Sequence, residues 1–224
     1  MAIEEVRFRP ADGEGEVRGI LHRAASPSAG LVVTHGRSSS MNARLVRRTA
    51  EAAAEHGLLA LRFNFRYVDA KGSASRDLSR EEEDLLGAVR FLRGALPSGP
   101  IFVAGASMGA RVCARASHDP DAAGVIALGY PLHPMFKPGV RNPPEWPKLK
   151  KPALFVQGDR DPFCDLARLR EDLPRLAAPH DLVVIPDAGH SFEPKGAKRD
   201  TFPEIWSAVR EWLDRARGSR QGLS

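Results

Sequence analysis

Cysteine is scarce in this sequence, and long apolar runs are absent. Cys113 and Cys164 are the two thiols in 224 residues, too few for the disulfide framework on which small secreted domains depend. No apolar stretch approaches the length of about 18 residues that predicts a membrane-spanning helix. The first residues, Met-Ala-Ile-Glu-Glu-Val-Arg, are acidic where a signal peptide is basic and then apolar. We therefore expect a cytoplasmic protein without a membrane partner.

Aromatic residues are also few, at 7% of the chain. The net charge is +5, but the densest basic groups, Arg47-Arg48 and 148–151, contain no aromatic side chain on which a base would stack. Phosphate binding needs a clustered basic stripe, so we expect no nucleic-acid partner. Zinc-ligand spacing and glycine-rich phosphate loops are missing as well. We expect neither a metal nor an organic cofactor.

What remains is the composition of one ordinary globular domain, with 42% hydrophobic and 27% charged residues. We expect a single domain over 1–217 and a disordered tail over 218–224. The segment 131–152 holds seven prolines, which exclude a helix of useful length there. This segment is expected to be a long ordered loop or a flexible lid, not a helical cap domain.

Apolar runs and segments of helical spacing alternate along the chain. A turn rich in glycine predicts an N-terminal antiparallel hairpin at 4–9 and 16–23. The later strands are continuously apolar, as parallel strands covered on both faces are; we expect them at 30–34, 58–63, 101–104, 125–128, 153–157 and 182–185. Helices are expected at 42–56, from Ser79, where Glu82 completes a capping box, and after 201. This order predicts an α/β fold with a mostly parallel sheet flanked by helices on both faces.

The motif Gly105-Ala106-Ser107-Met108-Gly109 directly follows the strand at 101–104 and precedes a segment of helical spacing. A strand, a tight turn and a helix around Gly-x-Ser-x-Gly form a nucleophile elbow, in which a strained serine projects its hydroxyl above the sheet. The flanking glycines let the backbones approach closely. Ser107 is therefore our candidate nucleophile. The alternative is a strand-to-helix turn without chemistry.

A serine hydroxyl is a poor nucleophile without a base, and the base needs an acid to orient it. In the elbow fold, the order along the chain is serine, acid, histidine. His190 lies in a short loop just past the strand at 182–185, where parallel sheets place their sites. We favour it among the seven histidines, with His133 as its serious competitor.

Three carboxylates are candidates for the acid. Asp159 and Asp161 follow the strand at 153–157. We favour Asp161, with Asp159 shaping the turn instead. Asp187 is only three residues before His190, which suits a residue that builds that loop.

Backbone N–H groups beside the serine are candidates for holding an oxyanion. The Met108 N–H lies at the start of the helix that follows the elbow. The turn Thr34-His35-Gly36-Arg37 follows an earlier buried strand, and we expect the Arg37 N–H to be the second donor, with Gly36 making room. His35 is expected to be a structural histidine rather than a second base.

The proline-rich segment is expected to lie over this site as the roof or wall of its pocket. Met135, Phe136, Trp146 and Phe163 would make the pocket apolar, which favours short acyl or aromatic esters. Alternatively, these residues anchor the segment to the core. His133 would touch the substrate or only pin the loop.

Taken in order, these motifs resemble those of the α/β-hydrolase superfamily over about the whole chain: His35-Gly36, Gly105-Ala106-Ser107-Met108-Gly109, Gly158-Asp159-Arg160-Asp161 and Ala188-Gly189-His190. A narrower resemblance, to the small hydrolase-like proteins related to animal testis-expressed protein 30, rests on Leu61-Arg62-Phe63, Ser107-Met108-Gly109-Ala110-Arg111, Tyr130-Pro131-Leu132-His133-Pro134 and Phe155-Val156-Gln157-Gly158. Dienelactone-hydrolase-like proteins are more distant relatives. In the narrower family, the acid follows the glycine with two residues between, which supports Asp161.

Two classes of function remain open. The resemblance implies a lidless hydrolase with a serine triad, which would cleave a carboxylic ester or related acyl bond of a small molecule through an acyl-enzyme. Thioesterase and peptidase activities are variants of this class, whereas the epoxide and haloalkane branches need a carboxylate nucleophile. The second class is a hydrolase-like binding or scaffold protein with little or no turnover, since the narrower family includes members of larger assemblies.

Overall fold

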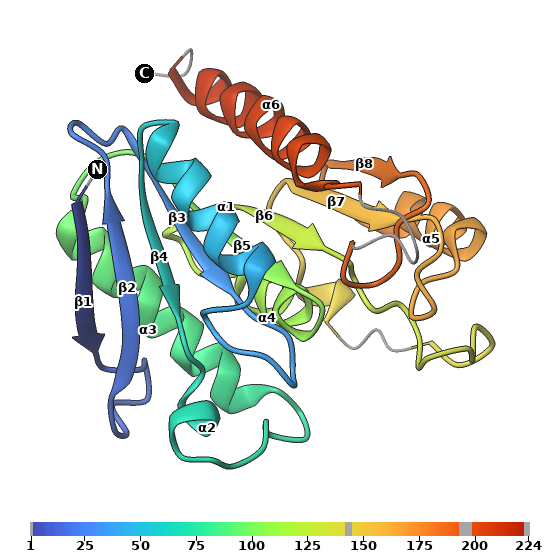
Figure 1. Cartoon of the computed structure of the whole chain (residues 1–224), viewed down its shortest axis with the longest axis horizontal. Helices are drawn as coiled ribbons and strands as arrows, with labels where there is room; N and C mark the ends of the chain where they lie inside the picture. Colours follow the sequence, from blue (N-terminus) through green and yellow to red (C-terminus); the bar gives the residue numbers. More distant parts are fainter. Residues whose placement is uncertain (1, 142–144, 193–198, 222–224) are drawn as a thin grey trace.

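The computed structural model describes residues 2–141, 145–192 and 199–221. These residues build an eight-stranded sheet in the order β1-β2-β4-β3-β5-β6-β7-β8 (Figure 1). Its strands are β1 Ala2–Phe8, β2 Val17–Arg23, β3 Ala29–Thr34, β4 Leu58–Phe63, β5 Ile101–Ala106, β6 Ala122–Leu128, β7 Ala153–Gly158 and β8 His180–Ile185. The β1–β2 and β2–β4 pairs are antiparallel, and all the other pairs are parallel. The predicted parallel sheet and its N-terminal hairpin are confirmed.

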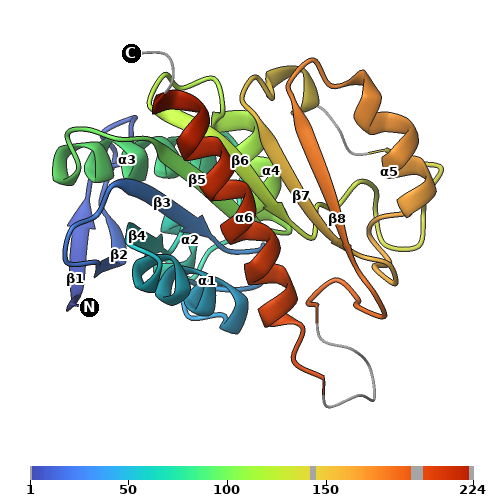
Figure 2. The ribbon, with the colours of Figure 1, turned by 90° about the horizontal axis from the view of Figure 1, so that it is seen from above.

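Helices cover both faces of this sheet, as Figure 2 shows. On one face lie α1 Arg44–Glu55 and α6 Phe202–Gln221. On the other lie α3 Ser79–Ala95, α4 Met108–Ala116 and α5 Leu166–Asp172. The remaining short elements are α2 Arg66–Asp69 and the 3-10 turns Trp146–Lys148 and Leu173–Arg175. No helical cap domain stands above the sheet in the described part of the chain.

The central strands are apolar without alternation because both of their faces are buried. Successive side chains of a strand point to opposite faces. In β3, Leu31 and Val33 pack in the layer of α1 and α6, whereas Val32 packs in the layer of α3 and α4. Because the strands from β3 to β8 are parallel, their carboxyl ends lie along one edge of the sheet.

The capping box predicted for α3 is wrong. Leu78 is the N-cap residue, in the left-handed region at φ 62°, and no side chain caps the helix. The Glu82 carboxylate instead accepts a hydrogen bond from Arg115 Nε of α4, at 2.8 Å. Glu82 therefore joins two helices, a contact between distant segments that a local spacing rule does not anticipate.

Helix α6 extends further than the sequence predicts. It continues through Gln221, so the described chain is helical over 218–221 of the predicted tail, and 222–224 lie outside the described residues. The centroid of the Trp212 ring of α6 lies 5.7 Å from the centroid of the Phe102 ring of β5. Within the described residues, no helix has the length and apolar character needed to span a membrane.

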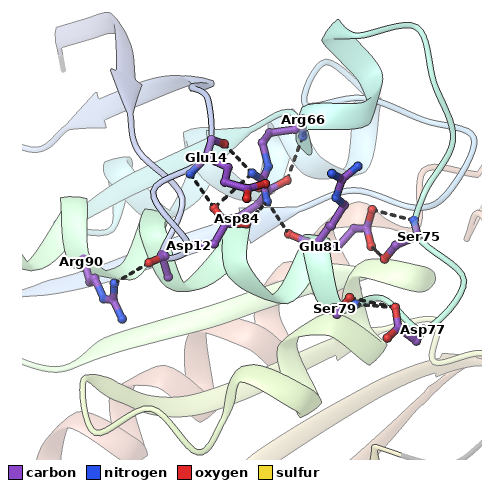
Figure 3. Close-up of polar contacts among 11 residues, drawn as sticks. Asp12, Glu14, Arg66, Ser75, Asp77, Ser79, Glu81, Asp84 and Arg90 are labelled. Carbon is purple, nitrogen blue, oxygen red and sulfur yellow. Dashed lines mark hydrogen bonds and ion pairs between the residues drawn. The ribbon is translucent and has the colours of Figure 1, made fainter.

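A polar network holds α2 against α3 and the turn of the hairpin (Figure 3). The Arg66 N–H donates to Asp84 Oδ2 at 2.8 Å, and the Arg66 guanidinium pairs with both Asp84 and Asp12. Glu81 accepts hydrogen bonds from the N–H and the hydroxyl of Ser75. Asp84 and Glu81 are each only 1% exposed. The network fixes α2 beside the loop that follows β3.

Candidate active site

Ser107 lies at the tip of the turn between β5 and α4. Its φ of 54° is in the left-handed region and strains a residue that has a side chain. Its N–H donates to the Leu128 carbonyl at 3.0 Å. A Cβ on Gly105 would lie 2.2 Å from the carbonyl carbon of Gly109, and one on Gly109 would lie 2.4 Å from Thr34 Oγ1. The motif therefore has the geometry of a nucleophile elbow.

The loops after β7 and β8 pack on each other. The Arg160 N–H donates to the Ala188 carbonyl oxygen at 3.0 Å. A Cβ on Gly158 would lie only 2.2 Å from that same oxygen, so the contact requires glycine. The close approach brings the candidate acid and the candidate base to one place, although 29 residues separate them along the chain.

Ser107, His190 and Asp161 form one hydrogen-bonded chain. His190 Nε2 lies 2.8 Å from Ser107 Oγ, and His190 Nδ1 lies 2.8 Å from Asp161 Oδ2. A carboxylate only accepts hydrogen bonds, so Nδ1 carries the proton and Nε2 is free to accept from the serine hydroxyl. The Asp161 side chain is fully buried and also accepts from Gln157 Nε2 at 2.6 Å and from the Phe163 N–H at 2.8 Å. These donors hold the carboxylate in line with the imidazole.

Gln157 is a site residue that sequence reasoning missed. It lies near the end of β7, it is fully buried, and its amide donates to the candidate acid. The signal in the sequence is a polar residue in an otherwise continuous apolar strand, four positions before Asp161. Buried amides must find partners, so such a residue points to a polar group nearby.

The competing carboxylates lie apart from the histidine ring. Asp159 is exposed and makes no hydrogen bond to His190 among the described contacts. Asp187 forms an ion pair with Arg160 and has a φ of 59°, so it helps to build the loop between the two strands. Of the three candidate acids, the geometry brings Asp161 to His190.

The loop after β3 places Gly36 against the serine. A Cβ at this position would lie 3.3 Å from Ser107 Cβ. The Gly36 carbonyl accepts from His35 Nδ1 at 2.8 Å. Because a trans peptide directs its C=O and N–H in opposite senses, the Arg37 N–H points away from His35. The Met108 N–H is at the first residue of α4, where it has no partner within the helix. Arg37 and Met108 both line the cavity that Ser107 borders.

His35 has the structural role expected for it. Its Nε2 accepts from the Phe65 N–H at 3.2 Å, which leaves Nδ1 to donate to the Gly36 carbonyl. Burial lowers the pKa of His35, so the neutral form that makes both bonds is favoured. The ring orients the loop on which the Arg37 N–H lies.

A cavity of about 710 Å³ opens above the serine. Arg44 and Leu45, in the first turn of α1, form part of its wall. The predicted site residues that line it are Arg37, Ser107, Met108, His133, Phe163 and His190. The Phe163 ring centroid lies 4.4 Å from that of the His190 ring, which gives the cavity an apolar wall beside His190.

His133 lines the cavity, but its two ring nitrogens are already engaged. Nε2 accepts from the Asp165 N–H at 2.9 Å, so Nδ1 carries the proton, 2.8 Å from the Pro134 carbonyl oxygen. A ring held in this way is not available as a base. His133 pins the start of the proline-rich segment, which is one of its two expected roles.

Three residues predicted for the pocket do not line it. Trp146 packs against the core, with its ring centroid 5.9 Å from that of Tyr130 and 6.3 Å from that of Phe155. It therefore anchors the segment to the core, which is the alternative role given for it above. Met135 and Phe136 are 50% and 76% exposed, because the chain turns outward after the cavity-lining residues. The segment borders the cavity only near its start, and 142–144 lie outside the described residues.

Neither cysteine is poised to act as a nucleophile. Burial raises the pKa of Cys113 and of Cys164 to about 12, so both stay as thiols. Among the described residues, no group of three or more His, Cys, Asp or Glu side chains is arranged to hold a metal ion.

Comparison with solved structures shows where this fold recurs. The chain is similar to a serine hydrolase without a lid from Xanthomonas campestris, at 24% identity over 95% of both chains with a TM-score of 0.74. It is similar to dienelactone hydrolase from Anabaena variabilis, at 23% identity over 96% of this chain and 99% of that one, with a TM-score of 0.76. It is also similar to an esterase from Pyrococcus furiosus, at 24% identity over 96% and 92%, with a TM-score of 0.76.

At these identities, the likeness to solved structures shows the fold. The narrower resemblance to proteins related to testis-expressed protein 30 stays a prediction. Residues 27–215 match the model of the family described as an alpha/beta hydrolase domain, which spans most of the chain. The chain therefore belongs to the α/β-hydrolase family.

Proposed function

We propose that this α/β hydrolase cleaves carboxylic esters or related acyl bonds through an acyl-enzyme on Ser107. The observation that carries the proposal is the hydrogen-bonded chain from Ser107 through His190 to Asp161, with 2.8 Å at each step. Ser107, the first residue of this hydrogen-bonded chain, has a strained backbone at the elbow and borders the cavity. Nucleophile, base and orienting acid are the parts that serine-based acyl transfer needs.

In the first half of the reaction, His190 Nε2 takes the proton of Ser107 while Oγ attacks the substrate carbonyl carbon. The imidazolium that forms is stabilised by the buried carboxylate of Asp161 through Nδ1. The carbonyl oxygen becomes an oxyanion, and the Met108 and Arg37 N–H groups donate to it. When the tetrahedral intermediate collapses, the leaving alcohol takes the proton from Nε2, and the acyl group stays on Ser107.

In the second half, water replaces the alcohol. His190 Nε2 takes a proton from this water, whose oxygen attacks the acyl carbon. The same two N–H groups hold the second oxyanion, and the proton returns to Ser107 Oγ as the carboxylic acid leaves. Every proton transfer uses Nε2, so the chemistry requires that Nδ1 keep its bond to Asp161.

Labelling with a fluorophosphonate probe, followed by peptide mapping, tests whether a serine is activated and which one it is. We expect the probe on the peptide that contains Ser107, and a burst followed by turnover with p-nitrophenyl acetate and butyrate. Ser107→Ala is expected to abolish labelling and to lower turnover on the order of 10⁴-fold or more. Ser38→Ala, a change on the cavity wall, is a matched control that should retain labelling.

Absence of labelling and of turnover across a broad panel of esters and thioesters would contradict the proposal. That outcome would favour the binding or scaffold class, in which the elbow is kept without chemistry. Labelling of a serine other than Ser107 would contradict the assignment of the nucleophile even if turnover were found.

A further inference from the structure

Four large apolar side chains are exposed on the described part of the chain, and three of them gather in one loop. Met135, Phe136 and Val140 are 50%, 76% and 54% exposed, whereas the fourth, Ile3, lies on the edge strand β1. Single exposed apolar residues need no explanation, but a group of them marks a binding surface. We call Met135, Phe136 and Val140 the apolar loop; it projects from the lower right of the molecule in Figure 1.

Hydrogen bonds hold the apolar loop in a defined turn. The Phe136 N–H donates to the Pro162 carbonyl at 2.8 Å, the Lys137 N–H to the Pro134 carbonyl at 2.9 Å, and the Val140 N–H to the Lys137 carbonyl at 3.0 Å. The φ of Phe136 is 56°, a conformation that is rare for a bulky residue and persists only where the surroundings impose it. The fold thus keeps an exposed aromatic ring at a strained position.

This loop continues the wall of the cavity. Pro134 lines the cavity and directly precedes the apolar loop. On the other side, the Phe136 N–H is bonded to Pro162, whose neighbour Phe163 lines the cavity beside His190. The apolar loop is therefore joined to the cavity wall at two points, through Pro134 along the chain and through the backbone bond to Pro162 beside Phe163.

We infer that the apolar loop is the outer part of the acyl-binding site and that the substrates are esters of long-chain acyl groups. The carbonyl end of such a substrate would lie at Ser107, and the distal methylenes would leave the cavity and lie on the apolar loop. Contact between the acyl chain of the substrate and the apolar loop removes apolar surface of both from water, which stabilises the complex. This inference rests on the proposed function and adds the substrate class to it.

Continuity with the cavity is what selects an acyl chain as the occupant. A protein partner or a second copy of this chain would cover the loop without needing it to border the site. The charged residue within the turn, Lys137, lies beyond Phe136 along the chain, so the two residues that directly follow the cavity-lining Pro134, Met135 and Phe136, are uncharged and suit a hydrocarbon.

The test is a chain-length series of p-nitrophenyl acetate, butyrate, octanoate and dodecanoate, kept below the concentration at which each ester aggregates. For the unmodified chain, kcat/KM is expected to rise by about twofold for each methylene that reaches the loop. This factor corresponds to roughly half of the free energy gained when a methylene is fully buried. Phe136→Asn removes the ring while tolerating the left-handed backbone. It should lower the dodecanoate-to-acetate ratio of kcat/KM by about fivefold or more, and Met135→Gln should lower it less.

Ile3→Thr is the matched control, because among the described residues Ile3 is the one exposed large apolar side chain outside the loop. It is expected to leave the dodecanoate-to-acetate ratio unchanged. The inference is overturned if the ratio is the same in Phe136→Asn, Met135→Gln and the unmodified chain. It is also overturned if Phe136→Asn slows all the esters equally, since the loop would then act by holding Phe163 in place.

The fluorophosphonate labelling rate of each variant separates this inference from the proposed function. No labelling of the unmodified chain is a failure of the proposed function. Labelling and acetate turnover without any dependence on chain length is a failure of the inference alone. Sedimentation velocity and binding to phosphatidylglycerol vesicles complete the test: self-association or vesicle binding that Phe136→Asn abolishes, with the ester ratio unchanged, would assign the loop to a second copy or to a lipid surface.

Discussion

The phenolic hydroxyl of Tyr67 donates a hydrogen bond to the carbonyl oxygen of Arg37, 2.7 Å away. Tyr67 follows Arg66 in α2, so this bond links the polar network of Figure 3 to the loop that carries the proposed oxyanion donor. Burial raises the pKa of Tyr67 to about 12, so the donor stays protonated at neutral pH. The loop after β3 is therefore held to the segment 65–67 by two bonds, one from the Phe65 N–H to His35 and one from the Tyr67 hydroxyl to Arg37.

Tyr67→Phe is expected to lower kcat about fivefold, because one neutral hydrogen bond contributes about 1 kcal/mol and the Arg37 N–H is needed most in the transition state. KM should change by less than about twofold, since ground-state binding uses this N–H little. The Phe65 ring, stacked 6.2 Å from that of Tyr67, would keep the phenyl group in place. Steady-state kinetics with p-nitrophenyl butyrate measure both constants, and a change in KM alone would argue against this role.

Gly158→Ala and Gly94→Ala should change stability in opposite directions. A Cβ at Gly158 meets the Ala188 carbonyl oxygen at 2.2 Å, whereas a Cβ at Gly94 of α3 has nothing within 4 Å. Forcing the two loops apart is expected to cost about 2–4 kcal/mol of unfolding free energy. Gly94→Ala should add about 0.5 kcal/mol through helix propensity.

Urea denaturation of both variants measures these changes, with activity recorded on the folded fraction. The folded fraction of Gly158→Ala should also be less active than the folded unmodified chain, because the contact between the two loops sets the distance from Asp161 to His190. Equal activity per folded molecule in the two variants would show that the loop contact does not govern the site.

The parts of the fold that sequence predicts well are those set by local pattern. The strands were recognisable because burial on both faces leaves continuous apolar runs, and the elbow because two glycines are required within one turn. Order along the chain then indicates His190 and a carboxylate of the loop after β7, whereas the preference for Asp161 over Asp159 also rests on the family resemblance. In each case, a physical constraint acts on neighbouring residues.

The errors arose where a distant segment decides the outcome. Glu82 is bound by Arg115 and not by its own helix end. The outward turn of Phe136 depends on a bond to Pro162, and the inward packing of Trp146 depends on Tyr130. No spacing rule within the proline-rich segment contains this information, so the apolar residues there could not be sorted into pocket, core and surface.

The Asp84 carboxyl is expected to make stability depend on pH. Burial raises its pKa from 3.8 to about 6 in the folded protein, although Arg66 opposes the shift and nearby Glu81 adds to it. At pH values between 3.8 and about 6, the Asp84 carboxyl is mostly protonated in the folded state and mostly ionised in the unfolded state. The contribution of Asp84 to stability is therefore largest at low pH and falls as the pH rises through about 6.

Asp84→Asn removes this titration. We expect the unfolding free energy of the unmodified chain, minus that of the variant, to fall by about 2 kcal/mol between pH 4 and pH 7, because the pKa of Asp84 rises from 3.8 to about 6 on folding and each unit of pKa difference contributes about 1.36 kcal/mol over the pH range between the two values. Urea denaturation at several pH values measures the difference. Gly94→Ala, which removes no titratable group, is the control whose difference should stay flat, and a flat difference for Asp84→Asn as well would contradict the assignment.

Asp161→Asn and Asp159→Asn form the sharpest test of the site, because both residues are candidates for the acid from sequence, lie two positions apart and differ in their contacts. Asp161 accepts from His190 Nδ1, Gln157 and the Phe163 N–H. An asparagine there would present an amide that can donate to the ring, which favours the tautomer with the proton on Nε2 and removes the base. We expect kcat to fall on the order of 10³- to 10⁴-fold. Asp159→Asn should stay within about twofold of the unmodified chain, as surface substitutions usually do. The fluorophosphonate labelling rate should follow the same order, and a loss in Asp159→Asn with retention in Asp161→Asn would reassign the acid.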